Sequence, residues 1–415
     1  MSAARRLEGE LWMEGVRLAE VAERFGTPCY VYSRAAIEAA WRAFDDGLAG
    51  ADHLVCYAVK ANANLAVLGV LARLGSGFDI VSGGELARVL AAGGSPGRIV
   101  FSGVGKTADE IRAALRAGIR CFNAESEPEL ERLDALAGEL GVRAPVSLRV
   151  NPDVDARTHP YISTGLRGNK FGIAHDRALA AYDLAARLPN LDVTGIDCHI
   201  GSQILDLAPL AEALERVLEL ADALASRGIA IGHVDLGGGL GIRYREGDEA
   251  PDIGRWCRAV AARLAGTGHA IVVEPGRAIV GNAGVLLARV EYLKSGEGKR
   301  FAIVDASMSE LIRPALYEAW HDIEPLAELD RPVAEYDVVG PVCESADILG
   351  AGRRLALAPG DGIAILSAGA YGMAMSSNYN SRPRPCEVMV DGARAVEVRP
   401  REPLAALFAG ESTLD

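Results

Sequence analysis

The sequence predicts an α/β protein: a (β/α)8 TIM barrel joined to a second, mostly β domain of sandwich-like or barrel-like form. Two observations predict this. From about residue 34 to residue 283, short β-branched or apolar runs alternate with longer runs of helical period, as in successive βα units. After residue 283 the alternation stops, and short strand-like runs follow one another between Gly, Pro and Asp turns.

Eight strand candidates occupy the first region, a number and spread that fit one barrel of ~250 residues. They are residues 54–59, 77–81, 99–101, 120–122, 146–150, 193–198, 233–236 and 271–273. The helical stretches between them include residues 84–92, 108–117, 127–140, 177–187, 209–226 and 253–264.

The second region contains strand-like runs at residues 285–293, 301–304, 336–339, 362–366, 387–390 and 395–398. A further strand candidate, residues 29–32, precedes the barrel. A leading segment this short seldom forms a domain alone. We therefore expect residues 1–33 to join the β domain, residues 34–283 to form the barrel and residues 284–415 to complete the β domain.

Composition excludes several classes of function. The 415 residues include 43 Lys and Arg against 56 Asp and Glu, a net charge of −13, and an acidic surface repels nucleic acid. No run approaches the ~18 apolar residues of a membrane-spanning helix, and the N-terminus lacks the apolar core of a signal peptide. Seven scattered cysteines without a C-x-x-C pair favour free thiols in a cytoplasmic protein and no metal site.

Polar groups gather after the predicted barrel strands. In such a barrel the active site forms from the loops at the C-terminal ends of the strands. The groups found there include an amine, an imidazole, a glycine run, a carboxylate and a guanidinium, which are Lys60, His199, GGGLG at 237–241, Glu274 and Arg277. Their convergence predicts one site at one mouth of the barrel.

This set suits a phosphorylated, flat cofactor. A lysine at the buried end of a strand can form a Schiff base, and bare glycine backbone can approach a phosphate. Glu274 could hold a pyridine nitrogen protonated. Taken singly, His199 could instead be a core histidine, Lys60 a surface lysine and GGGLG a plain turn.

The chain closely resembles the bacterial diaminopimelate decarboxylases, in the alanine-racemase-like fold group of pyridoxal-phosphate enzymes. The resemblance covers nearly the whole chain and rests on motifs in the family's order: YAVKAN, FDIVSGGEL, FSGVGKT, RVNPDVDARTHPYISTGLRGNKFGI, HIGSQ, DLGGGLG, EPGR, LIRPALY, CES and GAYG. It implies a carboxy-lyase that converts meso-2,6-diaminopimelate to L-lysine and CO₂, the last step of lysine biosynthesis.

The resemblance also implies roles for the cofactor residues. Lys60 would carry pyridoxal 5′-phosphate, His199 would stack on its ring and Glu274 would pair with its pyridine nitrogen. The phosphate would be held by Ser202, Gly238, Gly239, Gly276, Arg277 and Tyr371.

The substrate residues implied by the resemblance come from both domains. The far carboxylate would be bound by Arg277, Arg313 and Tyr317, with Tyr371 nearby. Cys343 and Glu344 would enter from the partner subunit of a head-to-tail homodimer, with Glu344 at the distal ammonium group. Lys60 and Cys343 are both candidate proton donors, and the sequence does not choose between them.

Three alternatives differ from this reading at identifiable residues. An ornithine, arginine or carboxynorspermidine decarboxylase would act on a diamine-type substrate that gives Arg313 no carboxylate to bind. A non-catalytic, inhibitor-like homologue would be expected to lack Cys343, Glu344 or Arg277. A cofactor-free Schiff-base aldolase would need neither the phosphate loop nor Glu274.

Overall fold

The computed structural model describes residues 2–155 and 170–414, which form two compact units. The barrel unit consists of Glu38–Ile242 and Glu249–Ala278, and the second unit of Met1–Ile37, Arg243–Asp248 and Ile279–Asp415. The predicted domain limits after residues 33 and 283 stay a prediction. Within the described part of the chain, no helix has both the length and the apolar character that crossing a membrane requires.

The barrel unit closes on eight parallel strands, as predicted. They follow the order β5-β6-β7-β8-β9-β11-β12-β13, and β13 pairs back onto β5 with Val272 opposite Leu54. Each observed strand ends within two residues of its predicted limits. The strands are β5 (His53–Ala58), β6 (Gly77–Ile80), β7 (Ile99–Phe101), β8 (Cys121–Ala124), β9 (Ala144–Asn151), β11 (Leu191–Asp197), β12 (His233–Asp235) and β13 (Ala270–Val273), with the short β10 (Ile173–Ala174) beside β9.

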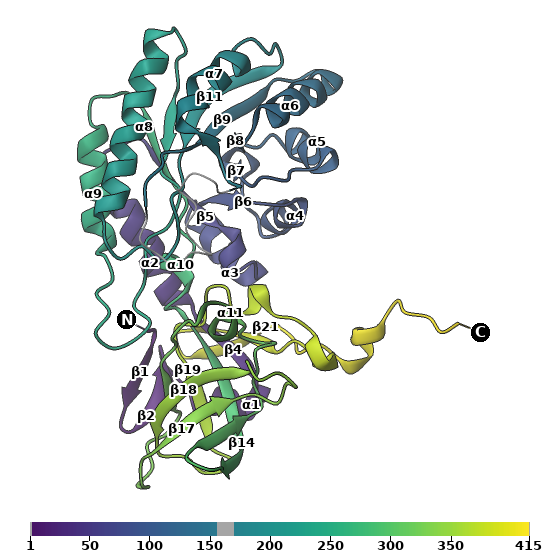
Figure 1. Cartoon of the computed structure of the whole chain (residues 1–415). Helices are drawn as coiled ribbons and strands as arrows, with labels where there is room; N and C mark the ends of the chain where they lie inside the picture. Colours follow the sequence, from purple (N-terminus) through teal and green to yellow (C-terminus); the bar gives the residue numbers. More distant parts are fainter. Residues whose placement is uncertain (1, 156–169, 415) are drawn as a thin grey trace. The chain divides into compact units, whose positions relative to one another are not determined.

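Helices cover the outside of these strands (Figure 1). Several begin at a side chain that caps the first turn, such as Thr107, which forms a capping box with Glu110. The helices are α2 (Arg34–Gly47), α3 (Leu65–Arg73), α4 (Gly83–Ala91), α5 (Ala108–Ala117), α6 (Glu127–Leu140), α7 (His175–Ala185), α8 (Ala208–Ser226) and α9 (Ile253–Leu264), with α10 (Arg277–Val280) after β13. Of the long motif that begins at Arg149, residues 156–169 lie outside the described residues.

The barrel interior contains an apolar layer, and polar residues lie at the C-terminal ends of most of its strands. Leu54, Cys56, Val100, Cys121 and Val272 form a buried cluster from four strands. Six of the eight strands end in a polar residue or are followed directly by one: Ser102, Glu125, Asn151, Asp197, Asp235 and Glu274. Because the strands are parallel, all of these ends meet at one mouth, where barrel enzymes place their active sites.

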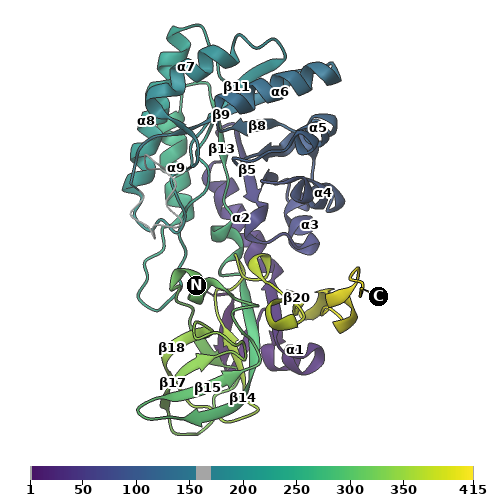
Figure 2. The same ribbon diagram turned by 45° about the vertical axis from the view of Figure 1, so that its right-hand side comes forward.

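The second unit is mostly antiparallel β-structure (Figure 2). Its main sheet runs β18-β17-β15-β14-β4-β20-β21, and β4 (Cys29–Ser33) pairs with both β14 and β20. The other strands are β14 (Gly284–Ser295), β15 (Arg300–Val304), β16 (Ile323–Pro325), β17 (Ala334–Val339), β18 (Ile348–Leu355), β19 (Gly362–Ile365), β20 (Cys386–Asp391) and β21 (Arg394–Arg399), with the helices α1 (Leu18–Phe25) and α11 (Arg313–Tyr317).

Several parts of the second unit were not predicted, among them the short β16, the strand β18 and the N-terminal sheet. β18 has the sequence ILGAGRRL, whose glycines and arginines obscure a strand pattern. The polar N-terminus forms a three-stranded sheet of β1 (Ala4–Leu7), β2 (Glu10–Met13) and β3 (Val16–Arg17). Its buried side chains, Leu11 and Met13 among them, belong to the core of the second unit.

Candidate active site

Lys60 is the second residue after the end of the first barrel strand. It is the middle residue of a single 3-10 turn, Val59–Ala61, that follows β5. Its Nζ donates to Oδ2 of Asp79 at 2.7 Å, and Asp79 lies fully buried in the neighbouring strand β6. The Lys60 side chain is 36% exposed. A buried carboxylate thus holds the amine at the barrel mouth and leaves it accessible.

Glu274 follows the last barrel strand and is buried. Its Oε1 accepts hydrogen bonds from Asn123 Nδ2 at 3.2 Å and from Ser102 Oγ at 3.4 Å. Asn123 also donates to Ser102 Oγ at 3.1 Å, so the two donors form one network. Side chains from β8 and from the end of β7 therefore orient the carboxyl group of Glu274.

Three buried aspartates lie near Glu274. Oxygens of Asp197, Asp235 and Glu274 lie within 4.8 Å of one another. Burial, followed by repulsion from Asp235, Asp79 and Asp197, raises the pKa of Glu274 well above its usual value. Burial also raises the pKa of Asp235 to about 6 and that of Asp197 well above its usual value. The same spacing could serve a cation, but the donors already directed at Glu274 favour carboxyl groups that share protons.

His199 lies just after β11 and contacts the glycine loop. Its Nδ1 accepts the backbone N–H of Gly238 at 3.1 Å, so the ring is neutral with its proton on Nε2. Burial, with the positive charges of Arg149 and Lys60, lowers the pKa of His199 well below its usual value. The barrel therefore presents a flat, uncharged ring at its mouth.

The glycine loop after β12 approaches its neighbours too closely for side chains. A Cβ on Gly238 would lie 2.4 Å from the carbonyl oxygen of Glu274. At Gly239, where φ is +107°, a Cβ would lie 2.7 Å from the carbonyl oxygen of Gly201. Both positions therefore require glycine, as in many anion-binding loops, and the N–H of Gly238 already donates to His199.

The side chains of Arg277 and Ser202 are hydrogen-bonded to each other in two other loops of the barrel unit. Ser202 Oγ accepts from Arg277 Nη2 at 2.9 Å and from Nε at 3.3 Å. Arg277 is buried and follows Gly276, where a Cβ would lie 3.0 Å from that of Ala61 in the Lys60 turn. Gly276 thus lets the chain before Arg277 pass close to Lys60.

Arg313 is a buried cation of the second unit. Its Nε donates to Nε2 of His321 at 3.3 Å, so His321 uses its Nδ1–H, which donates to the carbonyl oxygen of Leu366 at 2.9 Å. The guanidinium carbon lies 5.0 Å from the ring centre of Tyr244 and 5.8 Å from that of Tyr317. These contacts orient the guanidinium.

The other predicted residues of the second unit lie on loops. Cys343 and Glu344 are exposed in the connection between β17 and β18. Tyr371 follows β19 and has a φ of 56°, in the left-handed region that non-glycine residues seldom occupy. Of the predicted cofactor residues, all except Tyr371 belong to the barrel unit, and of the predicted substrate residues all except Arg277 belong to the second unit.

Comparison with known proteins identifies the family. Residues 34–281 match the pyridoxal binding domain of the pyridoxal-dependent decarboxylases. A diaminopimelate decarboxylase of Pseudomonas aeruginosa is 63% identical over 407 residues, which cover 98% of each chain. The chain belongs to the diaminopimelate decarboxylases. The predicted family, enzyme class and pyridoxal cofactor are thereby confirmed.

Solved structures of diaminopimelate decarboxylases share the fold. One from Helicobacter pylori, complexed with L-lysine, has a TM-score of 0.91 and 43% identity and covers 94% of this chain and 98% of that one. One from M. jannaschii, also with L-lysine, has a TM-score of 0.94 and 37% identity, with 99% and 98% covered. The predicted fold class is confirmed.

The barrel residues fit the cofactor of this decarboxylase family. An amine lies where a carbonyl could be attached, a buried carboxyl with a raised pKa can share a proton with a ring nitrogen, and a neutral imidazole can lie against an aromatic ring. Gly238 and Gly239 carry no side chain that could stand between their backbone and a phosphate. The roles of the individual residues remain predictions.

Several residues of the site were not singled out from the sequence. Asp79, Asn123, Asp197 and Asp235 lie within or at the ends of barrel strands and are buried. An acid or amide within an apolar strand is a detectable signal, because a buried polar group needs a partner. His321 and Tyr379, on irregular segments, offered no such pattern.

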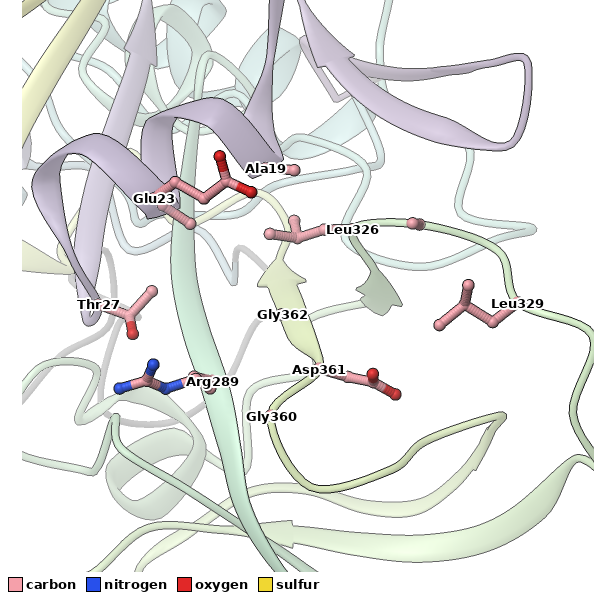
Figure 3. Close-up of a pocket in the computed structure, with 11 residues that line it drawn as sticks. Ala19, Glu23, Thr27, Arg289, Leu326, Leu329, Gly360, Asp361 and Gly362 are labelled. Carbon is pink, nitrogen blue, oxygen red and sulfur yellow. The ribbon is translucent and has the colours of Figure 1, made fainter.

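The second unit contains a separate cavity of about 310 Å³ (Figure 3). Two of its charged lining groups have partners. Asp361 pairs with Arg331, and Arg289 pairs with Glu291 at 3.4 Å. Its lining includes none of the predicted site residues, and we assign it no role in the reaction.

Proposed function

We propose that this chain decarboxylates meso-2,6-diaminopimelate to L-lysine and CO₂, the last step of lysine biosynthesis, with pyridoxal 5′-phosphate carried on Lys60. One observation carries the proposal. An amine and a buried carboxyl, Lys60 and Glu274, are held at the strand ends of a barrel that matches the pyridoxal binding domain of decarboxylases.

The barrel would hold the cofactor through groups it already orients. Lys60 would attach it covalently, and the backbone of Gly238 and Gly239 would help to hold its phosphate. Ser202, Gly276, Arg277 and Tyr371 would complete the phosphate site. When bound, the cofactor supplies an electron sink for the electron pair that remains as CO₂ leaves.

Side chains of the protein would hold and deliver protons around the bound cofactor. Glu274 would hold a proton at the ring nitrogen, and Ser102 and Asn123 would keep its carboxyl group aligned. His199 would cover a face of the ring without adding charge. Asp79 would stabilise Lys60 as an ammonium once the substrate amine has replaced it, which makes Lys60 a proton donor for the product. Cys343 is the other candidate donor.

Substrate selection would depend on the groups at the far end of diaminopimelate. Arg277, Arg313 and Tyr317 would bind the far carboxylate, with Tyr371 beside them, and Glu344 would bind the distal ammonium. A bidentate guanidinium–carboxylate pair is both strong and directional. A diamine-type substrate without that carboxylate would leave Arg313 buried with no ligand to bind.

We further propose a homodimer in which Cys343 and Glu344 complete the site of the partner subunit. Their exposure on a loop of the second unit is compatible with this role. We also propose a cytoplasmic location. All seven cysteines are free and six of them are buried, which suits a reducing compartment.

The proposed function is tested by incubating the purified holoenzyme with meso-diaminopimelate and measuring lysine and CO₂. We expect equal amounts of both products and no comparable turnover of ornithine or arginine. Equal turnover of ornithine or arginine would contradict the substrate. Absence of a visible band that borohydride abolishes would contradict the cofactor and favour an aldolase.

A further inference from the structure

The loop that carries Cys343 and Glu344 is fixed at its base by one buried carboxylate. Asp347 Oδ1 accepts the backbone N–H of Met308 at 2.6 Å, and its Oδ2 accepts that of Val342 at 2.8 Å. Asp347 is only 3% exposed. The backbone leading into Cys343 is therefore set by a buried acceptor, although the side chains at the tip are exposed.

A second segment contacts the tip of this loop. Tyr379 OH donates to Oε1 of Glu344 at 2.5 Å. The next residue, Asn380, accepts the backbone N–H of Cys343 on its Oδ1 at 3.0 Å. Two consecutive residues, Tyr379 and Asn380, thus contact the loop at Glu344 and Cys343. Both of these loop residues are predicted to take part in the reaction.

The turn that supplies these contacts, Tyr379–Ser381, has unfavourable backbone φ angles. Asn380 and Ser381 have φ values of 54° and 53°, in the left-handed region that is unfavourable for non-glycine residues. Other hydrogen bonds hold the turn in place. Ser377 N–H donates to the carbonyl oxygen of Ser309 at 2.9 Å, and Arg382 donates to that of Asp305 at 3.0 Å. Such strain is typical of functional turns.

We propose that Tyr379 is a positioning residue for substrate recognition, whose hydroxyl holds the Glu344 carboxylate in the orientation that receives the distal ammonium of the substrate. This inference rests on the proposed function, because it assumes that Glu344 binds that ammonium. It adds a residue that contacts Glu344 rather than the substrate.

Tyr379 is expected to strengthen substrate binding because it orders the Glu344 side chain in advance. An exposed glutamate loses rotamer freedom when it is immobilised, and ligand binding bears that entropic cost unless the protein has already ordered the side chain. The tyrosine hydroxyl occupies one of about four lone-pair positions of the carboxylate, which leaves the others for an ammonium. Its hydrogen bond to Glu344 raises the pKa of Tyr379, so the hydroxyl keeps the proton it donates.

The test compares two ligands of the holoenzyme that differ in one group. L-lysine keeps the ammonium and carboxylate of the distal centre of the substrate, whereas 6-aminohexanoate keeps the carboxylate and lacks that ammonium. With Tyr379→Phe, we expect the dissociation constant of L-lysine, measured by calorimetry, to rise about tenfold. That of 6-aminohexanoate should not change. Tyr292→Phe, at an exposed tyrosine of β14, is the matched control and should affect neither.

A double-mutant cycle tests whether Tyr379 acts on ligand binding through Glu344. In a Glu344→Gln background, Tyr379→Phe should weaken L-lysine binding no further, because the two residues act through one contact. If Tyr379→Phe weakens both ligands equally, or its effect adds fully to that of Glu344→Gln, the positioning role is wrong. If Glu344→Gln itself fails to distinguish the ligands, the proposed role of Glu344 is wrong as well, which is a separate result.

Discussion

The barrel unit and the second unit hold their functional side chains in different ways. In the barrel, Lys60 and Glu274 lie within two residues of strand ends, and their partners, Asp79 and Asn123, are buried in other strands of the same barrel. In the second unit, Glu344 lies on a loop and its hydrogen-bond partner, Tyr379, is itself exposed. Sheet hydrogen bonding fixes the first set, and side-chain contacts between loops fix the second.

This difference suggests that the two units have different functions in the enzyme. The match to pyridoxal-dependent decarboxylases covers residues 34–281, which include every predicted barrel residue of the site. Rigid groups there would carry chemistry common to those decarboxylases. The second unit would supply groups that recognise one substrate. Changes in the barrel should therefore reduce turnover, and changes in the second unit should reduce affinity.

The largest effect is expected at Lys60. Lys60→Ala should lower turnover by about 10⁴-fold or more, because it removes a covalent catalyst. Borohydride reduction of the wild-type holoenzyme, followed by peptide mapping, should place the pyridoxyl group on Lys60. Lys299→Ala, at an exposed lysine paired with Asp337, is the control and should stay active. A pyridoxyl label on any other lysine would refute the assignment.

Glu274→Gln should come next, with turnover about 10²–10³-fold lower and the cofactor still bound. The amide can keep hydrogen bonds to Ser102 and Asn123 but cannot hold a proton at the ring nitrogen. Cofactor content and steady-state turnover, measured on the same preparation, separate the two effects. Near-normal turnover would remove Glu274 from the mechanism.

Arg313→Lys tests the second unit. We expect kcat/KM for diaminopimelate to fall roughly 10- to 100-fold, mainly through KM, because an ammonium cannot replace a bidentate guanidinium that His321 orients. Steady-state kinetics provide the measurement. A fall in kcat at unchanged KM would mean that the second unit also controls the chemistry, and would break the division between the units.

The smallest effect concerns the buried acids. The raised pKa of Asp197 means that its stabilising contribution is complete below its unfolded pKa of about 3.9 and is lost as the pH rises toward the folded value. Asp197→Asn removes this loss. The apoprotein variant should gain stability over the wild type, on the order of 1 kcal/mol, with the gain growing from pH 5 to pH 8.

Urea unfolding at several pH values measures this difference. The exposed Asp109 provides the control, and Asp109→Asn should show no such trend. A difference between Asp197→Asn and wild type that stays constant with pH would mean that Asp197 is ionised in the folded protein across this range.

The sequence was most informative where local pattern and tertiary structure coincide. All eight barrel strands could be predicted because apolar runs alternate with helical stretches, and the position of Lys60 follows from the end of β5. The pairing of Lys60 with Asp79 depends on barrel closure between strands, which no local pattern encodes. The contact between Tyr379 and Glu344 joins two irregular loops 35 residues apart and leaves no periodic trace.

The central claim is that barrel groups of one subunit and loop groups of another form one site. The most direct measurement mixes Lys60→Ala and Glu344→Ala subunits after dissociation and reassociation, at a substrate concentration well below the wild-type KM. Each parent should be nearly inactive. The heterodimer should contain one intact site and one doubly damaged site, so random mixing should restore about a quarter of wild-type activity. Activity that stays at the level of the parents, although subunit exchange is shown independently, would contradict the shared site.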